Sequence, residues 1–291
     1  MNAPKTIATH DGNFHADDVF AIAILKMIYP DVVVVRTRDN ALMEKADLRV
    51  DVGFKYDPST GDFDHHQAGG AGKRANGIEY AACGLIWKHF GQLLVAERIQ
   101  QRIDFKLIQF IDAEDLGAVI YDEKLPPVTV ADLARLFNPL WNEQTDVDAC
   151  FMQAVRFAQH FIERLLAAMQ GEEQASIIVR AALNKSKRKD YIVLEEYAPW
   201  KDVIVGESEA KYVVYPALDK RDWTVYAVPI TKSSFEARQK MPASWGGKKD
   251  EELAKITGVS DAVFCHSGLW IAKAKSCAGA EKLAQLALAH K

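Results

Sequence analysis

Residues 5–28, KTIATHDGNFHADDVFAIAILKMI, determine how the first part of the chain folds. The short apolar run Lys5–Thr9 predicts a strand, and the turn-rich segment His10–Asn13 ends it. From Asp17 to Ile28 apolar residues recur at helical spacing, until Pro30 closes the pattern. The order of strand, turn and helix favours an α/β fold.

The same alternation continues beyond this segment. Val32–Val35 is an unbroken β-branched run, which is expected of a strand buried on both faces. Leu48–Val52 predicts a further strand, and helical patterns follow over Glu79–Leu116 and Val130–Phe137. Strands separated by helices indicate an α/β domain with a parallel, doubly wound sheet.

The second half of the chain has a different texture. Val147–Lys189 predicts a long helical region with a break near Gln170-Gly171. Short β-type runs and a final helix then follow, at Tyr191–Glu195, Lys211–Pro216, Trp223–Val228, Ala262–Cys265, Leu269–Ala272 and Ala278–Ala289. We predict a catalytic domain over residues 1–140, a helical linker over 141–190 and a smaller α/β, substrate-binding domain over 191–291.

Composition narrows the class of protein. The 291 residues are 49% apolar and 26% charged with a net charge of −4, as in ordinary globular proteins. This balance gives no general attraction to nucleic acid or to anionic membranes, so a nucleic-acid substrate needs a local basic surface. The four cysteines form no CxxC pair, and neither a signal peptide nor an apolar run of membrane-spanning length is evident. We therefore expect a cytoplasmic protein with no membrane partner.

Histidines and acids gather just after the predicted strands. Four of the eight histidines stand at positions 10, 15, 65 and 66, and Asp51 ends the strand Leu48–Val52. The carboxyl ends of strands in an open α/β sheet share one rim, so these residues can converge. Gly12 lets the backbone fold back, so that His10, His15 and Asp17 can face one centre. Imidazole with carboxylate and no thiolate suits Mn²⁺, Mg²⁺, Fe²⁺ or Zn²⁺.

Each acid also has a plainer interpretation. Asp17 and Asp18 fit the first turn of a helix, where the macrodipole favours negative charge. That effect accounts for one of the two aspartates but for neither histidine. Asp51 at the end of a buried strand is costly unless it is paired or metal-bound, and the alternatives are a helix cap or a salt bridge.

The run Asp64-His65-His66 is the third part of the pattern. On an extended segment adjacent side chains point to opposite sides, so one histidine at most is expected to bind a given metal. The other can donate to a phosphate oxygen or act as a general acid.

Together, His-x4-His-x-Asp, Val-Asp-Val-Gly and Asp-His-His resemble the motifs of the DHH phosphoesterase superfamily. The closer similarity is to its melanocyte-proliferating-gene (Myg) family, formerly called metal-dependent protein hydrolases. Further segments resemble that family, namely residues 34–39, Tyr56-Asp57-Pro58, Asn138-Pro139-x-Trp141-Asn142, Pro199-Trp200-Lys201 and His266-Ser267-Gly268. The sequence departs from the superfamily at His15, which replaces an expected aspartate with a neutral nitrogen ligand.

The resemblance implies a two-metal hydrolase that uses Mn²⁺ (or Mg²⁺). It implies a 3′–5′ exonuclease whose substrate is RNA or a short oligonucleotide. Asp51 would bridge the two ions, and Asp51 and His66 would be the catalytic residues, with His66 facing substrate. The remaining ligands implied are His10, His15, Asp17, His65 and Asp115. Asp112 is the alternative to Asp115, as a second ligand or a structural cap.

Basic residues supply candidate phosphate contacts. Arg36 and Arg38 end a strand on the same rim, where they would clamp phosphate or form surface ion pairs. In the second domain, Thr231–Lys249 contains five basic residues and one acid, with Phe235 and Trp245 among them.

Cations interleaved with aromatic rings suit a single strand, which predicts Arg238 and Lys248 as substrate contacts. The alternative is a solvated loop with two core aromatics. His266, in a loop between two strands, is a further substrate-binding candidate.

Three other functions stay open at this point. The same centre would serve a small-molecule phosphohydrolase acting on pyrophosphate or a nucleotide. A non-catalytic, metal-bearing RNA-binding protein is a second alternative, and an amide hydrolase is a third, because dinuclear sites also cleave peptides. The oligomeric state is open as well, and includes a homodimer.

Overall fold

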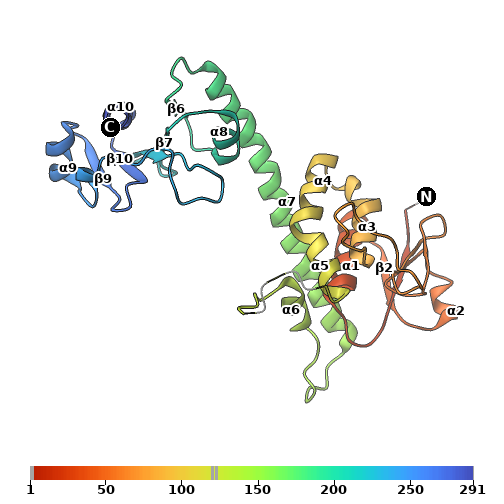
Figure 1. Cartoon of the computed structure of the whole chain (residues 1–291). Coiled ribbons are helices and arrows are strands. Elements are labelled where there is room, and N and C mark those ends of the chain that lie inside the picture. Colours follow the sequence, from red (N-terminus) through yellow and green to blue (C-terminus); the bar gives the residue numbers. More distant parts are fainter. Residues whose placement is uncertain (1–2, 119–120, 122–123, 291) are drawn as a thin grey trace. The chain divides into compact units, whose positions relative to one another are not determined.

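The computed structural model describes residues 3–118, 121 and 124–290 (Figure 1). They divide into two compact units, Met1–Met169 and Gln170–Lys291, called unit 1 and unit 2 below. The long helix α7 (Val147–Lys185) runs through the division. Its first half packs into the core of unit 1 through Phe151 and Val155, and its second half packs into unit 2 through Val179.

The break predicted near Gln170-Gly171 is therefore wrong. A glycine inside a helix costs about 1 kcal/mol relative to alanine. Here apolar side chains of α7 are buried on both sides of Gly171, in two cores, and this packing outweighs the local cost. The predicted linker over 141–190 is helical over most of its length, and the exact domain limits stay a prediction.

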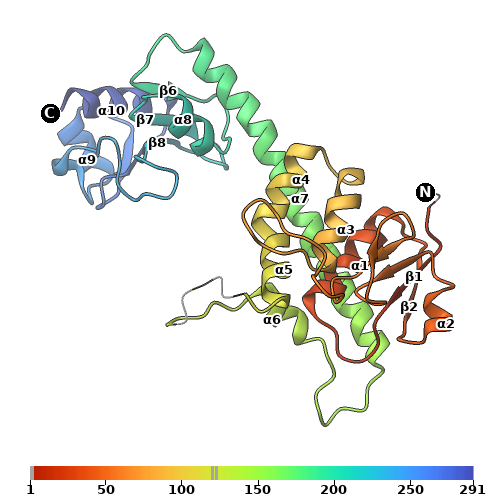
Figure 2. The same cartoon turned by 45° about the vertical axis from the view of Figure 1, so that its right-hand side comes forward.

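The sheet of unit 1 is mixed, in the order β2-β1-β3-β5-β4. Its first four strands in that order are parallel, and β4 pairs antiparallel with β5. Figure 2 shows β1 and β2 side by side. The strands are β1 (Thr6–Thr9), β2 (Val33–Arg36), β3 (Leu48–Val50), β4 (Tyr56–Asp57) and β5 (Asp62–Phe63). This confirms the α/β class, whereas the doubly wound arrangement stays a prediction.

One strand differs from its prediction. We expected the valine run before Arg36 to be buried on both faces, but β2 is an edge strand and Val33 is 56% exposed. A β-branched run is equally compatible with an edge position, because it reports strand propensity and not the number of neighbours.

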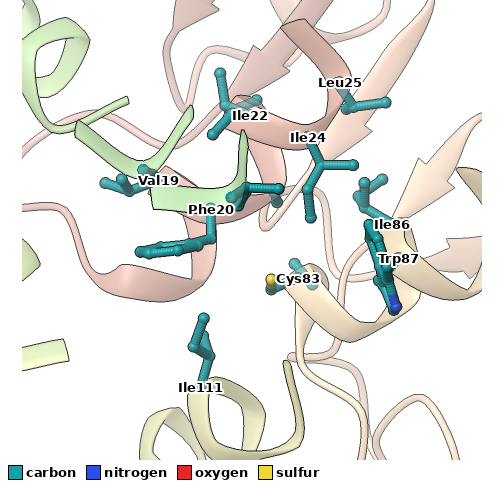
Figure 3. Close-up of a cluster of buried hydrophobic side chains, with 14 of the residues drawn as sticks. Val19, Phe20, Ile22, Ile24, Leu25, Cys83, Ile86, Trp87 and Ile111 are labelled. Atoms are coloured by element: carbon teal, nitrogen blue, oxygen red, sulfur yellow. The ribbon is translucent and has the colours of Figure 1, made fainter. Parts of the chain in front are cut away.

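Helix α1 (Ala16–Ile28) is the centre of unit 1. All its residues from Ala16 to Leu25 are buried, as expected of a helix that is packed on every side. Figure 3 shows Ile22, Ile24 and Leu25 of α1 with Cys83, Ile86 and Trp87 of the neighbouring helix α3 (Ala82–Phe90). The other helical segments are α2 (Asn40–Met43), α3 (Ala82–Phe90), a 3₁₀ turn (Gly91–Leu93), α4 (Glu97–Ile103), a π-helical turn (Asp104–Ile108), α5 (Gln109–Asp115) and α6 (Val130–Arg135).

Unit 2 is built on a second mixed sheet, in the order β6-β7-β8-β10-β9. Its strands are β6 (Tyr191–Val193), β7 (Tyr212–Pro216), β8 (Trp223–Ala227), β9 (Ala262–Cys265) and β10 (Ile271–Ala274). Its helices are α8 (Lys201–Glu207), α9 (Asp250–Thr257) and α10 (Cys277–Ala289), with a 3₁₀ turn at Ala243–Trp245. These elements confirm the strand and helix pattern predicted for the second half of the chain.

The two faces of this second sheet are covered differently. Helices α9 and α10 pack on one face, where Leu253 and Leu283 join the core. On the other face α8 and the end of α7 cover β6 and β7. Within the described part of the chain, no helix has the length and apolarity needed to cross a membrane.

Candidate metal centre

Three parallel strands of unit 1 deliver the predicted ligands to one rim. His10 follows β1, Asp51 follows β3, and the Asp64–His66 segment follows β5. Side chains from these segments, from the start of α1 and from the end of α5 line a cavity of about 640 Å³. Convergence at the carboxyl ends of strands is the behaviour expected of an open α/β sheet.

Backbone geometry at this rim is specialised. Asp51 has φ of 56°, Phe54 has φ of 55° and Gly53 has φ of 102°. A left-handed conformation is uncommon outside glycine, and it concentrates at functional sites. The turn after β3 thus places the Asp51 carboxylate and the Phe54 ring, both of which line the cavity.

Asp51 lies between two groups of ligands. Its Oδ2 is 3.3 Å from His10 Nε2, whereas its Oδ1 is 3.7 Å from His65 Nδ1 and 3.5 Å from His66 Nδ1. Each oxygen therefore faces different histidine nitrogens, an arrangement suited to a bridging carboxylate.

The first group joins His10, His15 and Asp18, whose ligand atoms lie within 4.8 Å of one another. His10 Nδ1 is 3.0 Å from the Asp11 carbonyl, which fixes Nδ1 as the donor and leaves Nε2 towards Asp18 at 3.2 Å. The loop that carries these histidines is held by Asn138, whose side chain bonds both the amide and the carbonyl of Phe14.

Asp18 is a residue that sequence reasoning missed. Its Oδ1 accepts from the amide of His15 at 2.8 Å, as a first-turn carboxylate should. Its Oδ2 is left over and faces His10. The available signal was the pair of adjacent acids, of which the helix macrodipole explains only one.

The second group joins Asp17, His65 and Asp115. His65 Nδ1 is 3.7 Å from Asp17, and its Nε2 is 3.3 Å from Asp115. Both oxygens of Asp17 also accept from the start of α3, at the amides of Ala82 (3.0 Å) and Cys83 (2.6 Å). The helix terminus orients this carboxylate while leaving it on the cavity wall.

Asp112 occupies a different environment. It accepts from the Gly84 amide at 2.8 Å and lies 2.7 Å from Arg74 Nη2. Asp112 also lies near Asp17 and Cys83, but the guanidinium beside it makes this cluster a poor cation site. The structure therefore places Asp115, and not Asp112, beside His65.

The predicted opposite orientation of His65 and His66 is wrong. Their rings stack with centroids 4.1 Å apart, and both face Asp51. Strand β5 ends at Phe63, so the alternation of an extended strand does not apply to the histidines. Asp64 holds the segment instead, by accepting from the His65 amide at 2.7 Å and from His66 Nδ1 at 2.7 Å. The two rings still differ in exposure, because His65 is buried and the His66 side chain is 50% exposed.

Electrostatics at the centre favour an added cation. Burial raises the pKa of Asp17 well above its usual range, and the charges of Asp115 and Asp51 add to the shift. Burial, with the charges of Asp51 and Asp18, raises the pKa of Asp115 to about 7. Burial alone would lower the pKa of His10, but the carboxylates of Asp18 and Asp51, at 3.2 and 3.3 Å from its Nε2, raise that pKa to about 10. Too many carboxylates share the cavity for all of them to be ionised unaided.

Three buried atoms also favour a bound cation. Among the described residues, Asp18 Oδ2, Asp51 Oδ1 and His65 Nδ1 are buried without a hydrogen-bond partner. Such atoms are costly unless a ligand satisfies them. Burial also raises the pKa of Cys83 and keeps its thiol protonated, so the donors are nitrogen and oxygen only. These residues fit divalent cations of the Mn²⁺ or Mg²⁺ type.

The two arginines predicted at the rim lie in different environments. The Arg36 side chain is only 3% exposed and bonds Asp148 at 2.8 Å and the Gly12 carbonyl at 2.6 Å. The guanidinium also lies over Phe151, so Arg36 joins α7 to the ligand loop and is not among the residues that line the cavity. Arg38 lines the cavity with a side chain 61% exposed. Arg135, which sequence reasoning missed, lines it too with a side chain 64% exposed.

In the basic segment predicted in unit 2, one cation and one aromatic ring are structural, and a substrate role of the segment stays a prediction. Arg238 donates to the carbonyls of Val205, Ser208 and Ala210 at 2.7–2.9 Å, and so caps the end of α8. Trp245 is buried in the core.

Lys248 is a surface residue that pairs with Glu252 at 3.2 Å. His266 is half-buried and adjoins Trp270, with ring centroids 4.6 Å apart. A substrate role for His266 stays a prediction.

Comparison with known proteins covers nearly the whole chain. The sequence profile MYG1_exonuc, described as an uncharacterised protein family (UPF0160), matches residues 6–288. A MYG1 protein of Dictyostelium discoideum is 31% identical over 94% of this chain and 94% of its own length. A MYG1 exonuclease of Bos taurus is 30% identical, and one of Homo sapiens 29%, over 100% of this chain and 86% and 88% of their lengths. No solved structure matches this chain.

Proposed function

Because the chain belongs to the MYG1 exonuclease family, we propose that it is a divalent-metal-dependent phosphodiesterase that removes nucleotides from the 3′ end of RNA or short oligonucleotides. Family membership makes the protein a hydrolase of the nuclease class. The metal requirement, the RNA substrate and the 3′–5′ direction are our proposal. The observation that carries it is the position of Asp51 between two sets of nitrogen and oxygen ligands.

The ligand sets assign roles to these side chains. Asp51 would be shared, with His10, His15 and Asp18 completing one site and Asp17, His65 and Asp115 the other. When bound, Mn²⁺ or Mg²⁺ at these positions lowers the pKa of a water molecule and offsets negative charge on the phosphate. The hydrogen bonds from α3 to Asp17, and from His10 to the Asp11 carbonyl, hold the ligand atoms in place beforehand.

His66 is the residue placed to handle a proton. Its Nδ1–H donates to Asp64 at 2.7 Å, so Nε2 is the nitrogen left for substrate. The side chain is half exposed at the cavity, whereas His65 beside it is buried. In the protonated form His66 donates Nε2–H to a phosphate or leaving oxygen, which makes it the general acid of our proposal.

Two exposed arginines suit the recognition of phosphate. Arg38 and Arg135 both line the cavity, and their ion pairs with Asp11 and Asp132 are solvent-exposed and therefore weak. A guanidinium binds phosphate through paired hydrogen bonds. We propose that these two side chains hold the phosphates next to the scissile bond.

A substrate panel tests the proposal. The protein, freed of metal with chelator and reloaded with Mn²⁺ or Mg²⁺, is given oligoribonucleotides labelled at either end, DNA, pyrophosphate, mononucleotides and a peptide. We expect stepwise shortening of 5′-labelled RNA from its 3′ end, only with metal. Asp51→Asn should lower this turnover by roughly 1,000-fold, as for loss of a main electrostatic group, whereas Asp31→Asn on the surface should not. Metal-independent turnover, or equal rates in both variants, contradicts the proposal.

A small-molecule phosphohydrolase is the second candidate. The cavity of about 640 Å³ lies entirely among residues of unit 1 and is large enough for a whole nucleotide. Hydrolysis of pyrophosphate or mononucleotides faster than oligoribonucleotides in the same panel would favour this function.

A further inference from the structure

Unit 2 carries a continuous row of aromatic side chains, outside the segment that the sequence singled out. Neighbouring ring centroids are 5.5 Å (Tyr197–Tyr215), 6.5 Å (Tyr215–Trp200), 5.3 Å (Trp200–Tyr226), 5.4 Å (Tyr226–Trp270) and 4.6 Å (Trp270–His266) apart. We call these six residues the aromatic row. It joins the segment before α8 to strands β7 and β8 and to the loop between β9 and β10.

The row has a buried floor and accessible rings. Trp200 is 4% exposed and Tyr215 is 9% exposed, so both are supports. Tyr197 is 44% exposed and Trp270 is 36% exposed, and Tyr226 between them is half-buried. Rigid aromatic rings held on a packed floor are suited to stacking against a flat ligand.

A cavity of about 400 Å³ opens beside the first part of the row. Its walls include Tyr197, Trp200 and Tyr226, and its charged lining residues are Lys201, Glu172 and Asp202, of which Asp202 pairs with Lys232 at 2.9 Å. The Lys201 ammonium is 5.6 Å from the centre of the Tyr226 ring and its residue is exposed. Aromatic rings with a cation over one of them match a flat base linked to a phosphate.

The far end of the row depends on Gly268. A Cβ at this position would lie 2.8 Å from Trp270 Cδ1 and 3.1 Å from His266 Nδ1, so a larger residue would force the two rings to move. The Gly268 amide donates to His266 Nδ1 at 2.9 Å. Nδ1 is therefore the acceptor, and the neutral ring carries its proton on Nε2, which becomes a hydrogen-bond donor.

We propose that the aromatic row binds the bases of a single-stranded nucleic acid, as a surface of unit 2 outside the metal centre. The inference rests on the proposed function for its ligand class. Several rings in succession suit several stacked bases, whereas a single quaternary ammonium group needs one closed cage. Lys201 and the Nε2–H of His266 supply donors for phosphates along such a strand. We thus assign nucleic-acid binding in unit 2 to the aromatic row, whereas the sequence predicted it for Thr231–Lys249.

Binding without catalysis tests the aromatic row. The probe is a fluorescein-labelled oligoriboadenylate, titrated with the full chain in chelator and followed by anisotropy. Tyr226→Ala and Tyr197→Ala should each weaken binding by roughly 10-fold, because stacking on an aromatic ring contributes about that factor per base. Tyr226→Phe should bind like the natural sequence, since it keeps the ring. Phe235→Ala is the matched control, because Phe235 is fully exposed on the same unit and outside the row.

The outcomes are separable from those of the proposed function. Unchanged affinity in both alanine variants would contradict binding at the aromatic row. Weaker binding by Phe235→Ala alone would contradict it as well, and would place the nucleic-acid surface at Thr231–Lys249. Displacement of the probe by millimolar tetramethylammonium would identify a cation cage instead. Should the alanine variants lose binding while the natural protein shows no metal-dependent turnover, the row stands and the proposed function fails.

Discussion

The candidate metal centre of unit 1 and the aromatic row of unit 2 differ in how their polar groups are satisfied. In the centre, buried Asp51 and Asp18 oxygens lack hydrogen-bond partners, and carboxylates crowd one cavity. In the row, Gly268 bonds His266, and the rings rest on one another. We therefore expect a bound cation to stabilise the first region, whereas the second is complete without its proposed ligand. We expect metal removal to loosen unit 1, and we expect the fold of unit 2 to be complete before nucleic acid binds.

Removal of metal is the test with the largest expected effect. A ligand present at 100 times its Kd stabilises a protein by about 2.7 kcal/mol, and at 1,000 times by about 4.1 kcal/mol. We expect Mn²⁺ to slow hydrogen–deuterium exchange in α1 and α3 and to leave β7 and β8 unchanged. In Asp51→Asn the protection by Mn²⁺ should be lost. Equal protection of both units would contradict the contrast.

The pH dependence of the metal-free protein follows from the same groups. The pKa of Asp115 is raised from 3.8 to about 7, so the folded state holds more protons than the unfolded state between these values, and stability falls as pH rises through them. The pKa of His10 is raised from 6.5 to about 10, so its contribution is present below 6.5 and is lost by 10. In chelator, Tm should therefore decline from pH 5 to 10, and Mn²⁺ should oppose the decline.

The arginines of unit 1 give the next contrast. Arg36→Ala removes a buried guanidinium with its bonds to Asp148 and to the Gly12 carbonyl, and should cost about 2–3 kcal/mol of unfolding free energy. Arg38→Ala removes an exposed side chain and should cost less than about 0.5 kcal/mol. Denaturant unfolding measures both. An equal loss in the two variants would mean that Arg38 is part of the fold.

Local sequence patterns predict much of this architecture. The helical spacing of Asp17–Ile28 gave α1 within one residue, because its apolar residues face a core on every side. Because ligands bind at the carboxyl ends of strands in open α/β sheets, the sequence also predicted that His10, Asp51 and His65 converge, although they are far apart in the chain. Polar residues in a place where burial is costly are informative on their own.

What could not be predicted depends on partners remote in sequence. Arg36 is engaged by Asp148, which lies 112 residues away, and no local pattern reveals that pairing. The rings of His65 and His66 can stack because β5 ends at Phe63, before both histidines. The sequence did not predict the aromatic row for a further reason. Trp200, Tyr215 and Tyr226 are residue types that are common in hydrophobic cores, and only their alignment in the structure distinguishes them.

The smallest expected effects lie in the basic segment of unit 2, and they decide whether it is structure or surface. Arg238 donates three hydrogen bonds to the carbonyls at the end of α8, so Arg238→Ala leaves these acceptors without partners and should cost about 1–2 kcal/mol. Lys248 makes one exposed pair with Glu252 four residues on, and Lys248→Ala should cost at most about 0.5 kcal/mol. Neither change should alter the salt dependence of oligoribonucleotide binding, since a lost phosphate contact lowers that slope by roughly 0.7 for a single strand. A flatter slope in Lys248→Ala alone would show that this lysine meets phosphate, and would extend the nucleic-acid surface of unit 2 from the aromatic row to the basic segment.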